Sequence, residues 1–184
     1  MAGLKRIQIG KAVLYLCCQT LGSICAGLFI YYTRGAKYAH SKSFTGFPWL
    51  SPEYDQTVGF FAEAIGTALL MYIIMASAVD KQTPRDIFGI MIGLALFVCV
   101  LSIGPVTGSC LNPARLIGPF LVAEFIGDLD KPWTSIWIYM LGPIFGALLG
   151  GFYYEFFMLP EENDDEVEEM DSADEDEELD KLEA

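Results

Sequence analysis

Residues 104–115 read GPVTGSCLNPAR, a polar turn inside an otherwise apolar region of the chain. Backbone outside a helix is tolerated at membrane depth only where protein buries it or where it lines a water-filled cavity. Asn112 suits a helix N-cap and Pro113 suits the first helical position, and an apolar run follows as far as Ala123. We therefore expect a re-entrant loop and half-helix over residues 104–123, with the positive N-terminal end of the half-helix directed into a pathway.

The composition divides the chain into a membrane body and an acidic tail. The chain has 184 residues, 53% of them hydrophobic, and a mean hydropathy of +0.40, which argues against an ordinary soluble domain. Residues 161–184 contain 15 acidic residues and one lysine, so this tail carries −14 of the formal net charge of −13 and the rest of the chain carries +1. We expect a transmembrane domain over residues 1–160 and a disordered acidic tail over residues 161–184.

Four apolar stretches reach or approach the roughly 20 residues that cross a bilayer. They cover residues 12–32, 58–79, 87–103 and 135–159. These stretches predict an all-α membrane protein with four transmembrane helices and one re-entrant half-helix. Small residues one turn apart, Gly22 with Ala26 and Gly142 with Gly146, predict close helix packing in the first and last spans. Lysine and arginine residues are nearly balanced between the two sides of the membrane, with a slight excess that favours a cytoplasmic N-terminus and tail.

Two charged residues lie at positions that suggest a role. Glu63 is an acid deep in the second span, so it should face the interior of the bundle. A proton relay and a structural acceptor for the N–H groups of the polar turn are both compatible with it, and the lack of a histidine, aspartate or lysine partner within the spans favours the structural role. Arg115 begins the half-helix, where a buried cation repels protons and cations and donates hydrogen bonds to neutral solutes; an arginine that reaches the membrane interface is the alternative.

Several motifs resemble those of the aquaporin, or major intrinsic protein (MIP), channels. Residues 107–115, TGSCLNPAR, resemble the second Asn-Pro-Ala loop of that family. Residues 61–67 (FAEAIGT) resemble the opening of its fourth span, and residues 19–22 (QTLG) resemble its third. Residues 142–143 (GP) and 152–156 (FYYEF) resemble its sixth span. The resemblance covers about residues 7–159, and the order of these motifs makes it specific.

The resemblance implies six spans and two half-helices, each half-helix starting at an Asn-Pro-Ala motif. The chain is thus expected to be an N-terminally truncated aquaporin-like bundle that lacks the first two spans and the first Asn-Pro-Ala half-helix. An internal repeat gives the same expectation, because residues 21–24 (LGSI) resemble residues 141–144 (LGPI) at an offset of 120. That offset places the partner of Asn112 before residue 1.

The resemblance also implies a passive channel for water, with small neutral solutes such as glycerol as further permeants. Asn112, Pro113, Ala114 and Arg115 would form the pore motif, and Val100 and Ser109 would join Arg115 at the outer constriction. Valine stands where water-selective members usually have histidine, which implies a wider or more apolar opening. Leu116 stands where glycerol channels usually have aspartate, so the indications for the solute are mixed.

The remaining expectations concern partners and alternatives. The family implies a homotetramer in the plasma membrane or an internal vacuolar membrane, with no cofactor, no metal, no nucleic acid and no enzymatic activity. With one wall of the pore outside the chain, we expect no selective pore from this chain alone. A non-conducting interaction or regulatory subunit with an acidic docking tail is one alternative function, and a proton-coupled carrier that uses Glu63 is another.

Overall fold

The computed structural model describes residues 7–34, 46–80, 84–125 and 132–158 of the chain. These residues form five α-helices and short 3₁₀ and π turns, and no β-strand occurs among them. The predicted all-α class is therefore confirmed. The acidic tail (residues 161–184) lies outside the described residues.

Four of the helices are long and apolar enough to cross a membrane. They are α1 (Ile9–Arg34), α2 (Gln56–Ile74), which continues into the π-helical turn η3 (Met75–Val79), α3 (Phe88–Thr107) and α5 (Ile136–Phe157). The fifth, α4 (Pro113–Phe125), has 13 residues and is about 20 Å long, too short to cross. The predicted count of four spans and one half-helix is thus confirmed.

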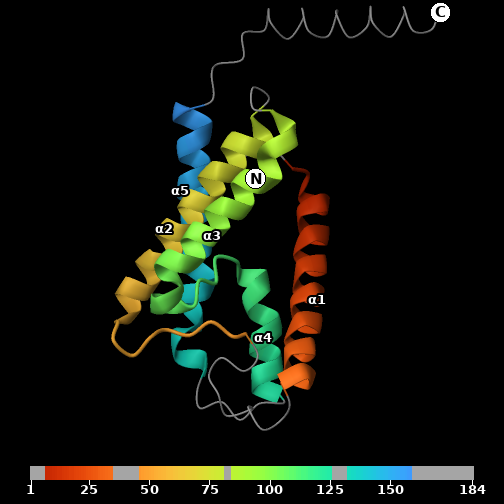
Figure 1. Cartoon of the computed structure of the whole chain (residues 1–184), viewed down its shortest axis with the longest axis vertical. Helices are drawn as coiled ribbons and strands as arrows, with labels where there is room; N and C mark the ends of the chain where they lie inside the picture. The colour runs from red at the N-terminus through yellow and green to blue at the C-terminus, as the bar shows by residue number, and fades with distance from the viewer. Residues whose placement is uncertain (1–6, 35–45, 81–83, 126–131, 159–184) are drawn as a thin grey trace, which may run out of the picture.

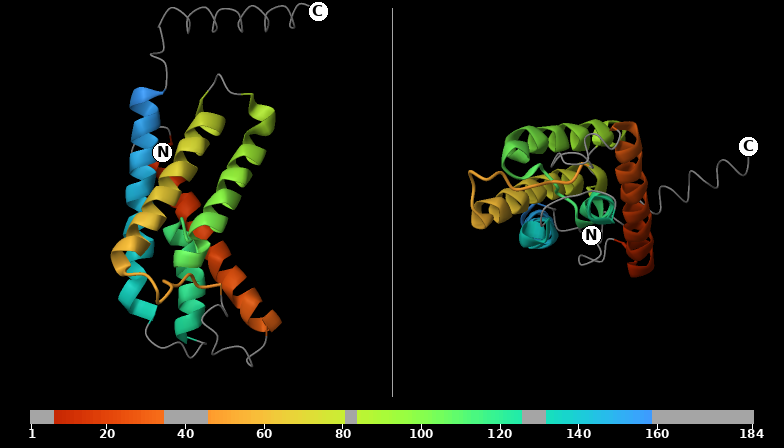
Figure 2. Two further views of the ribbon diagram at one scale, coloured as in Figure 1. Left: turned by 60° about the vertical axis from the view of Figure 1, so that its left-hand side comes forward. Right: turned by 90° about the horizontal axis from the view of Figure 1, so that it is seen from below.

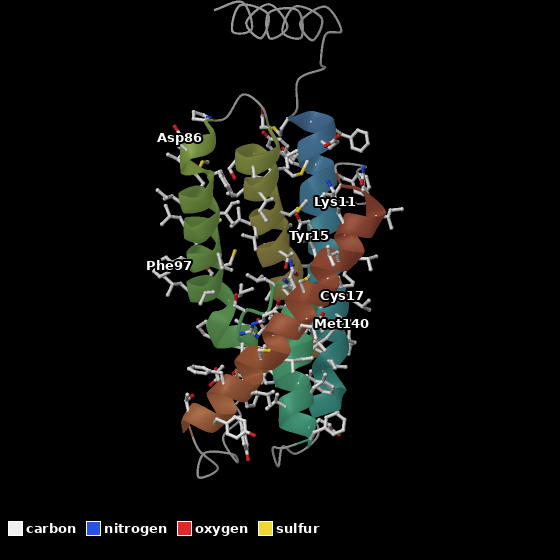
Figure 3. The ribbon with its side chains drawn as sticks, turned by 90° about the vertical axis from the view of Figure 1, so that its right-hand side faces the viewer. Lys11, Tyr15, Cys17, Asp86, Phe97 and Met140 are labelled. Atoms are coloured by element: carbon white, nitrogen blue, oxygen red, sulfur yellow. The ribbon has the colours of Figure 1, made fainter. Side chains whose placement is uncertain are left out.

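The four spans run in alternating directions, and α4 lies in the lower half of the bundle. Figure 1 shows α1, α3 and α4 running towards one end, and α2 and α5 towards the other. After α3 the chain turns back towards mid-height, where α4 begins and then descends beside α1 (Figures 1 and 2). Lys11 and Asp86 are labelled near the same end of the bundle in Figure 3, so α1 and α3 begin at the same end, on opposite sides in that view.

Helix α3 ends later than the sequence led us to expect. The sequence predicts an end at Ile103, where the polar turn of residues 104–115 begins. The helix instead continues to Thr107 and stops at Gly108, whose φ of 81° is left-handed and whose N–H donates to the carbonyl of Gly104 at 2.8 Å. The irregular segment is therefore residues 108–112 and not the longer loop from residue 104.

Helices α2 and α5 pack through glycines. A methyl group at Gly146 would fall on the carbonyl oxygen of Ala64, and one at Gly150 would fall on that of Ala68. A methyl group at Gly142 would lie 3.0 Å from the Cβ of Glu63. The close approach expected at Gly142 and Gly146 is thus present, and it brings the backbone of α5 against the face of α2 that carries Glu63.

Helix α1 contacts α4 through a different face from the expected one. Among the described residues, a methyl group at Gly22 would meet nothing within 4 Å and Ala26 is exposed, so this pair does not face α4. The contact runs instead through Ser23 and Gly27, one position further along: a methyl group on Gly118 of α4 would fall on the backbone of Ser23. Both pairs have small residues four apart, and the sequence of α1 alone does not show which one faces α4.

An extended segment between α1 and α2 closes the lower end of the core. Phe47 in this segment packs on Phe120 of α4 and Tyr139 of α5, with ring centroids 5.9 and 6.5 Å away. The N–H of Ser51 donates to the carbonyl of Val106 at 2.8 Å. The segment therefore holds the end of α3, the half-helix and α5 together directly below the polar turn.

Candidate functional site: a polar turn beside a cavity

The turn between α3 and α4 has an unusual backbone. Ser109 and Leu111 have φ values of 52° and 57°, and Gly108 has 81°. A side chain other than glycine in the left-handed region is strained by about 1–3 kcal/mol and persists only where its surroundings enforce it. Left-handed residues within a turn can direct successive N–H groups to one side, which makes a concave site for an anion.

Glu63 supplies that anion. Its side chain is fully buried, and its Oε1 accepts hydrogen bonds from the hydroxyl of Thr107 at 2.6 Å and the N–H of Cys110 at 2.8 Å. Its Oε2 accepts from the N–H of Leu111 at 2.7 Å. A buried carboxylate is stabilised when its oxygens accept several hydrogen bonds, and here the same bonds offset the backbone strain of the turn. The structure thus places Glu63 as the acceptor of the N–H groups of the turn.

Thr107 and Tyr139 form a second layer around this carboxylate. Thr107 is fully buried, and its hydroxyl also accepts a hydrogen bond from the N–H of Ser109 at 3.2 Å. The phenol of Tyr139 donates to the carbonyl of Thr107 at 3.1 Å, so it pairs one of the terminal carbonyl groups of α3. Neither residue was expected from the sequence to have a role. Thr107 stands in the quoted motif, but its contact with Glu63 spans 44 positions and only the tertiary fold shows it.

Asn112 begins the half-helix as expected from its type. Its Oδ1 accepts from the N–H of Ala114 at 2.9 Å, and its own carbonyl accepts from the N–H of Leu116 at 3.2 Å. This is the hydrogen-bond pattern of an N-cap followed by proline at the first helical position. Its Nδ2 donates to Oε1 of Gln19 on α1 at 3.2 Å.

A cavity of about 500 Å³ opens beside the N-terminus of α4. The lining residues come from α2, α3, α5 and the turn: Thr67, Leu70, Met71, Ile74, Leu96, Val100, Ser109, Cys110, Leu111, Asn112, Arg115 and Ala147. Val100, Ser109, Asn112 and Arg115 are therefore brought together on one cavity.

The other two residues of the expected pore motif lie elsewhere. Pro113 and Ala114 are not among the lining residues. Ala114 is fully buried, and its carbonyl accepts a hydrogen bond from the hydroxyl of Ser23 at 2.8 Å. The same hydroxyl accepts from the N–H of Gly118 at 3.1 Å, so it bridges two backbone groups one turn apart. Pro113 and Ala114 thus set the start of the half-helix, and Ala114 joins it to α1.

The walls of the cavity differ in polarity. One side is apolar, with Leu70, Ile74 and Leu96. On the other side, Ser109 Oγ and Arg115 Nη1 are buried and have no hydrogen-bond partner within the described part of the chain. Because α4 also begins there, this side carries the charge of Arg115 and the positive end of the helix dipole. The arrangement can donate hydrogen bonds to a neutral solute and disfavours cations.

Comparisons with known proteins agree on one family. The family model described as "Major intrinsic protein" matches residues 2–154. The chain is similar to "Aquaporin PIP2-1" of Arabidopsis thaliana, with 33% identity over 165 residues that cover 84% of this chain and 53% of the relative. It is also similar to "Aquaporin PIP2-4" of Zea mays, with 31% identity over 159 residues covering 84% of this chain and 53% of the relative. The chain therefore spans about half the length of these relatives.

A solved structure supports the fold independently. The aquaglyceroporin from Plasmodium falciparum matches with a TM-score of 0.74 and 21% sequence identity, covering 86% of this chain and 69% of that one. At this level of identity the likeness concerns the fold alone.

Proposed function

We propose, on the premise that this chain belongs to the major intrinsic protein family, that its cavity is part of a passive membrane pathway for water and small neutral solutes. The chain is an integral membrane protein, and its family consists of channels and not of enzymes. The observation that carries the proposal is the meeting of Val100, Ser109, Asn112 and Arg115 on one cavity at the start of the half-helix.

In the proposed mechanism, solute passes along the polar side of the cavity, which carries Ser109 and Arg115. Asn112 donates a hydrogen bond from Nδ2 to the passing oxygen, and carbonyl groups of residues 108–111 accept from its hydrogens. The carbonyls of Val106 and Thr107 take no part, because they already accept from the N–H of Ser51 and the phenol of Tyr139. Arg115 and the dipole of α4 repel cations and hydrated protons.

Glu63 has a structural part in this mechanism. Both of its oxygens accept hydrogen bonds from the turn or from Thr107, and the side chain is fully buried. We therefore assign it to holding the turn and not to a proton relay, which would need a path between Glu63 and water.

The proposed solutes are water and small neutral molecules such as glycerol. The plant relatives are named aquaporins and the solved structure is that of an aquaglyceroporin, and the two names cover these two classes. The cavity has apolar surface from Val100 and Leu96. It also has polar groups, which come from Asn112, Ser109 and Arg115. A solute with a carbon backbone and hydroxyl groups can contact both sides. Assembly as a homotetramer, in a plasma or vacuolar membrane with the tail in the cytoplasm, belongs to the same proposal.

A second candidate function is a non-conducting interaction or regulatory subunit. The observation that favours it is the exposed surface of α1, where Leu14, Leu21 and Phe29 are 62%, 63% and 69% exposed. Lipid or a protein partner can cover such a surface. In this function the chain binds a longer relative through its spans, and the acidic tail docks a basic partner.

Osmotic shrinkage of proteoliposomes, followed by light scattering, tests the proposal. Because the chain spans about half the length of the relatives, it is reconstituted alone and also after co-expression with the N-terminal half of the Arabidopsis relative. We expect water permeability above that of empty vesicles in at least one preparation, with a weaker temperature dependence than the bare bilayer. Permeability equal to empty vesicles in both preparations would refute the pathway, and binding to a full-length relative without added flux would then support the second function.

A further inference from the structure

Gln19 is a polar side chain in the middle of an apolar span. It lies near the centre of α1 (Ile9–Arg34), and its residue surface is exposed. Polar side chains at the middle of a bilayer are costly unless they face protein or a water-filled space. Within the described residues, the hydrogen bond between Gln19 Oε1 and the Nδ2 of Asn112, 3.2 Å long, satisfies this requirement.

The packing of α1 on α4 fixes this pair in place. Ser23, one turn after Gln19, bridges the backbone groups of Ala114 and Gly118. Gly27, one turn further, packs against Gly118 and Val122. Residues four apart on a helix share one face, so the line 19, 23, 27 follows α4 from its N-cap downwards. The contact between Gln19 and Asn112 is thus the first in a continuous row of contacts between α1 and α4, and not an isolated surface contact.

The two ends of the Asn112 amide are held by different helices. Its Oδ1 accepts from the N–H of Ala114, and an amino group turned to that position would set two donors against each other, so the cap sets the orientation of the amide. One contact still allows the amide plane to pivot about the Oδ1···N line. The second contact, from Nδ2 to Gln19, fixes the plane.

We propose that Gln19 is a positioning residue for Asn112: it accepts one of the two Nδ2 hydrogens, fixes the amide plane, and leaves the other hydrogen as the donor to a solute in the cavity. This inference rests on the proposed function for the role of that remaining donor. It extends the site to α1, which contributes no residue to the cavity lining.

The hydrogen bond between Gln19 and Asn112 can be followed by NMR, without measuring solute permeability. Asparagine occurs at residues 112 and 163 of the sequence and nowhere else. A sample labelled with ¹⁵N-asparagine therefore gives two side-chain amide pairs by NMR in bicelles, and the pair from Asn163 in the acidic tail is an internal reference.

Three variants separate positioning from general packing. Gln19→Met keeps the length of the side chain and removes the acceptor, and Gln19→Glu keeps an acceptor oxygen. Gln8→Met makes the same change just before α1 and is the matched control. We expect Gln19→Met to move the Asn112 amide protons upfield and to speed their exchange with water by about fivefold, as loss of a hydrogen bond worth about 1 kcal/mol implies. Gln19→Glu should restore the wild-type pattern, and Gln8→Met should not change it.

An Asn112 amide pair that is the same in Gln19→Met and wild type would overturn the proposal, because the cap would then suffice to hold the amide. If Gln19→Met does not fold, the wild-type spectrum decides. Asn112 amide protons that exchange at least about fivefold more slowly than those of Asn163 support the bond, and equal rates overturn it. None of these NMR measurements depends on permeability. The hydrogen bond between Gln19 and Asn112 can therefore be confirmed or refuted even if the protein conducts no solute.

Discussion

Replacing Glu63 by glutamine should destabilise the protein far more than the loss of one charge at its surface. The carboxylate is fully buried and accepts three hydrogen bonds of 2.6–2.8 Å, two of them from consecutive backbone N–H groups. Glutamine has the same shape but one acceptor oxygen. Whichever way its amide turns, an NH₂ group faces a donor of the turn, and one buried donor loses its acceptor.

The size of the effect follows from these contacts. A hydrogen bond to a charged group contributes about 1.5–3 kcal/mol, and an unsatisfied buried donor costs about 1–3 kcal/mol. The left-handed backbone at Ser109 and Leu111 adds strain that the lost bonds no longer offset. We expect Glu63→Gln to lower the free energy of unfolding by about 3–5 kcal/mol.

Unfolding by titration with sodium dodecyl sulfate in mixed micelles, followed by circular dichroism, measures this change. Glu124→Gln is the matched control, because Glu124 is an exposed residue of α4 and should change the unfolding free energy by less than about 0.5 kcal/mol. Hydrogen exchange gives a local readout: protection of the N–H groups of Cys110 and Leu111 should fall by about 10²- to 10³-fold. If the two variants are equally stable and the exchange of the turn is unchanged, the structural role of Glu63 is wrong.

Three other variants and one control probe the packing around the site, each by the same titration. Gly146→Ala places a methyl group on the backbone of α2 and should cost at least about 3 kcal/mol, whereas Gly93→Ala, with open space around it, should be neutral or stabilising by up to about 1 kcal/mol. Tyr139→Phe removes the hydrogen bond to the end of α3 and should cost about 1 kcal/mol; no change would show that this bond is dispensable. Ser23→Ala removes the bridge between α1 and α4 and should cost about 1–2 kcal/mol, with faster proteolysis of α1 as the accompanying result.

The sequence predicts most of the framework because its signals are local. Apolar length gives the four spans, and Asn112 with Pro113 gives the start of α4 at the residue where the structure places it. The position of Glu63 deep in a span requires a hydrogen-bonded interior environment, and the turn provides donors at the right depth. These features depend on residue type and short spacing.

The features that the sequence does not predict depend on contacts between distant segments. Helix α3 passes Pro105 and reaches Thr107 because Ser51 and Tyr139 pair its terminal carbonyls, and neither contact is visible in the local sequence. The choice between the faces of α1 is decided by the shape of α4 at Gly118. The left-handed residues Ser109 and Leu111 have no glycine to indicate them, because Glu63 enforces their conformation.

The water permeability of vesicles with Val100→Trp, compared with Val98→Trp, tests the proposed pathway most directly. Val100 lines the cavity and Val98 on the same helix does not, although the two residues are similarly exposed, at 46% and 50%. The indole fills part of the cavity only at position 100. We expect a conducting preparation to lose most of its water permeability, about tenfold, with Val100→Trp, and to keep it with Val98→Trp. This fall corresponds to about 1.4 kcal/mol in the barrier to passage. Equal permeability of the two variants, or no permeability above that of empty vesicles in the wild type, would contradict a pathway through this cavity.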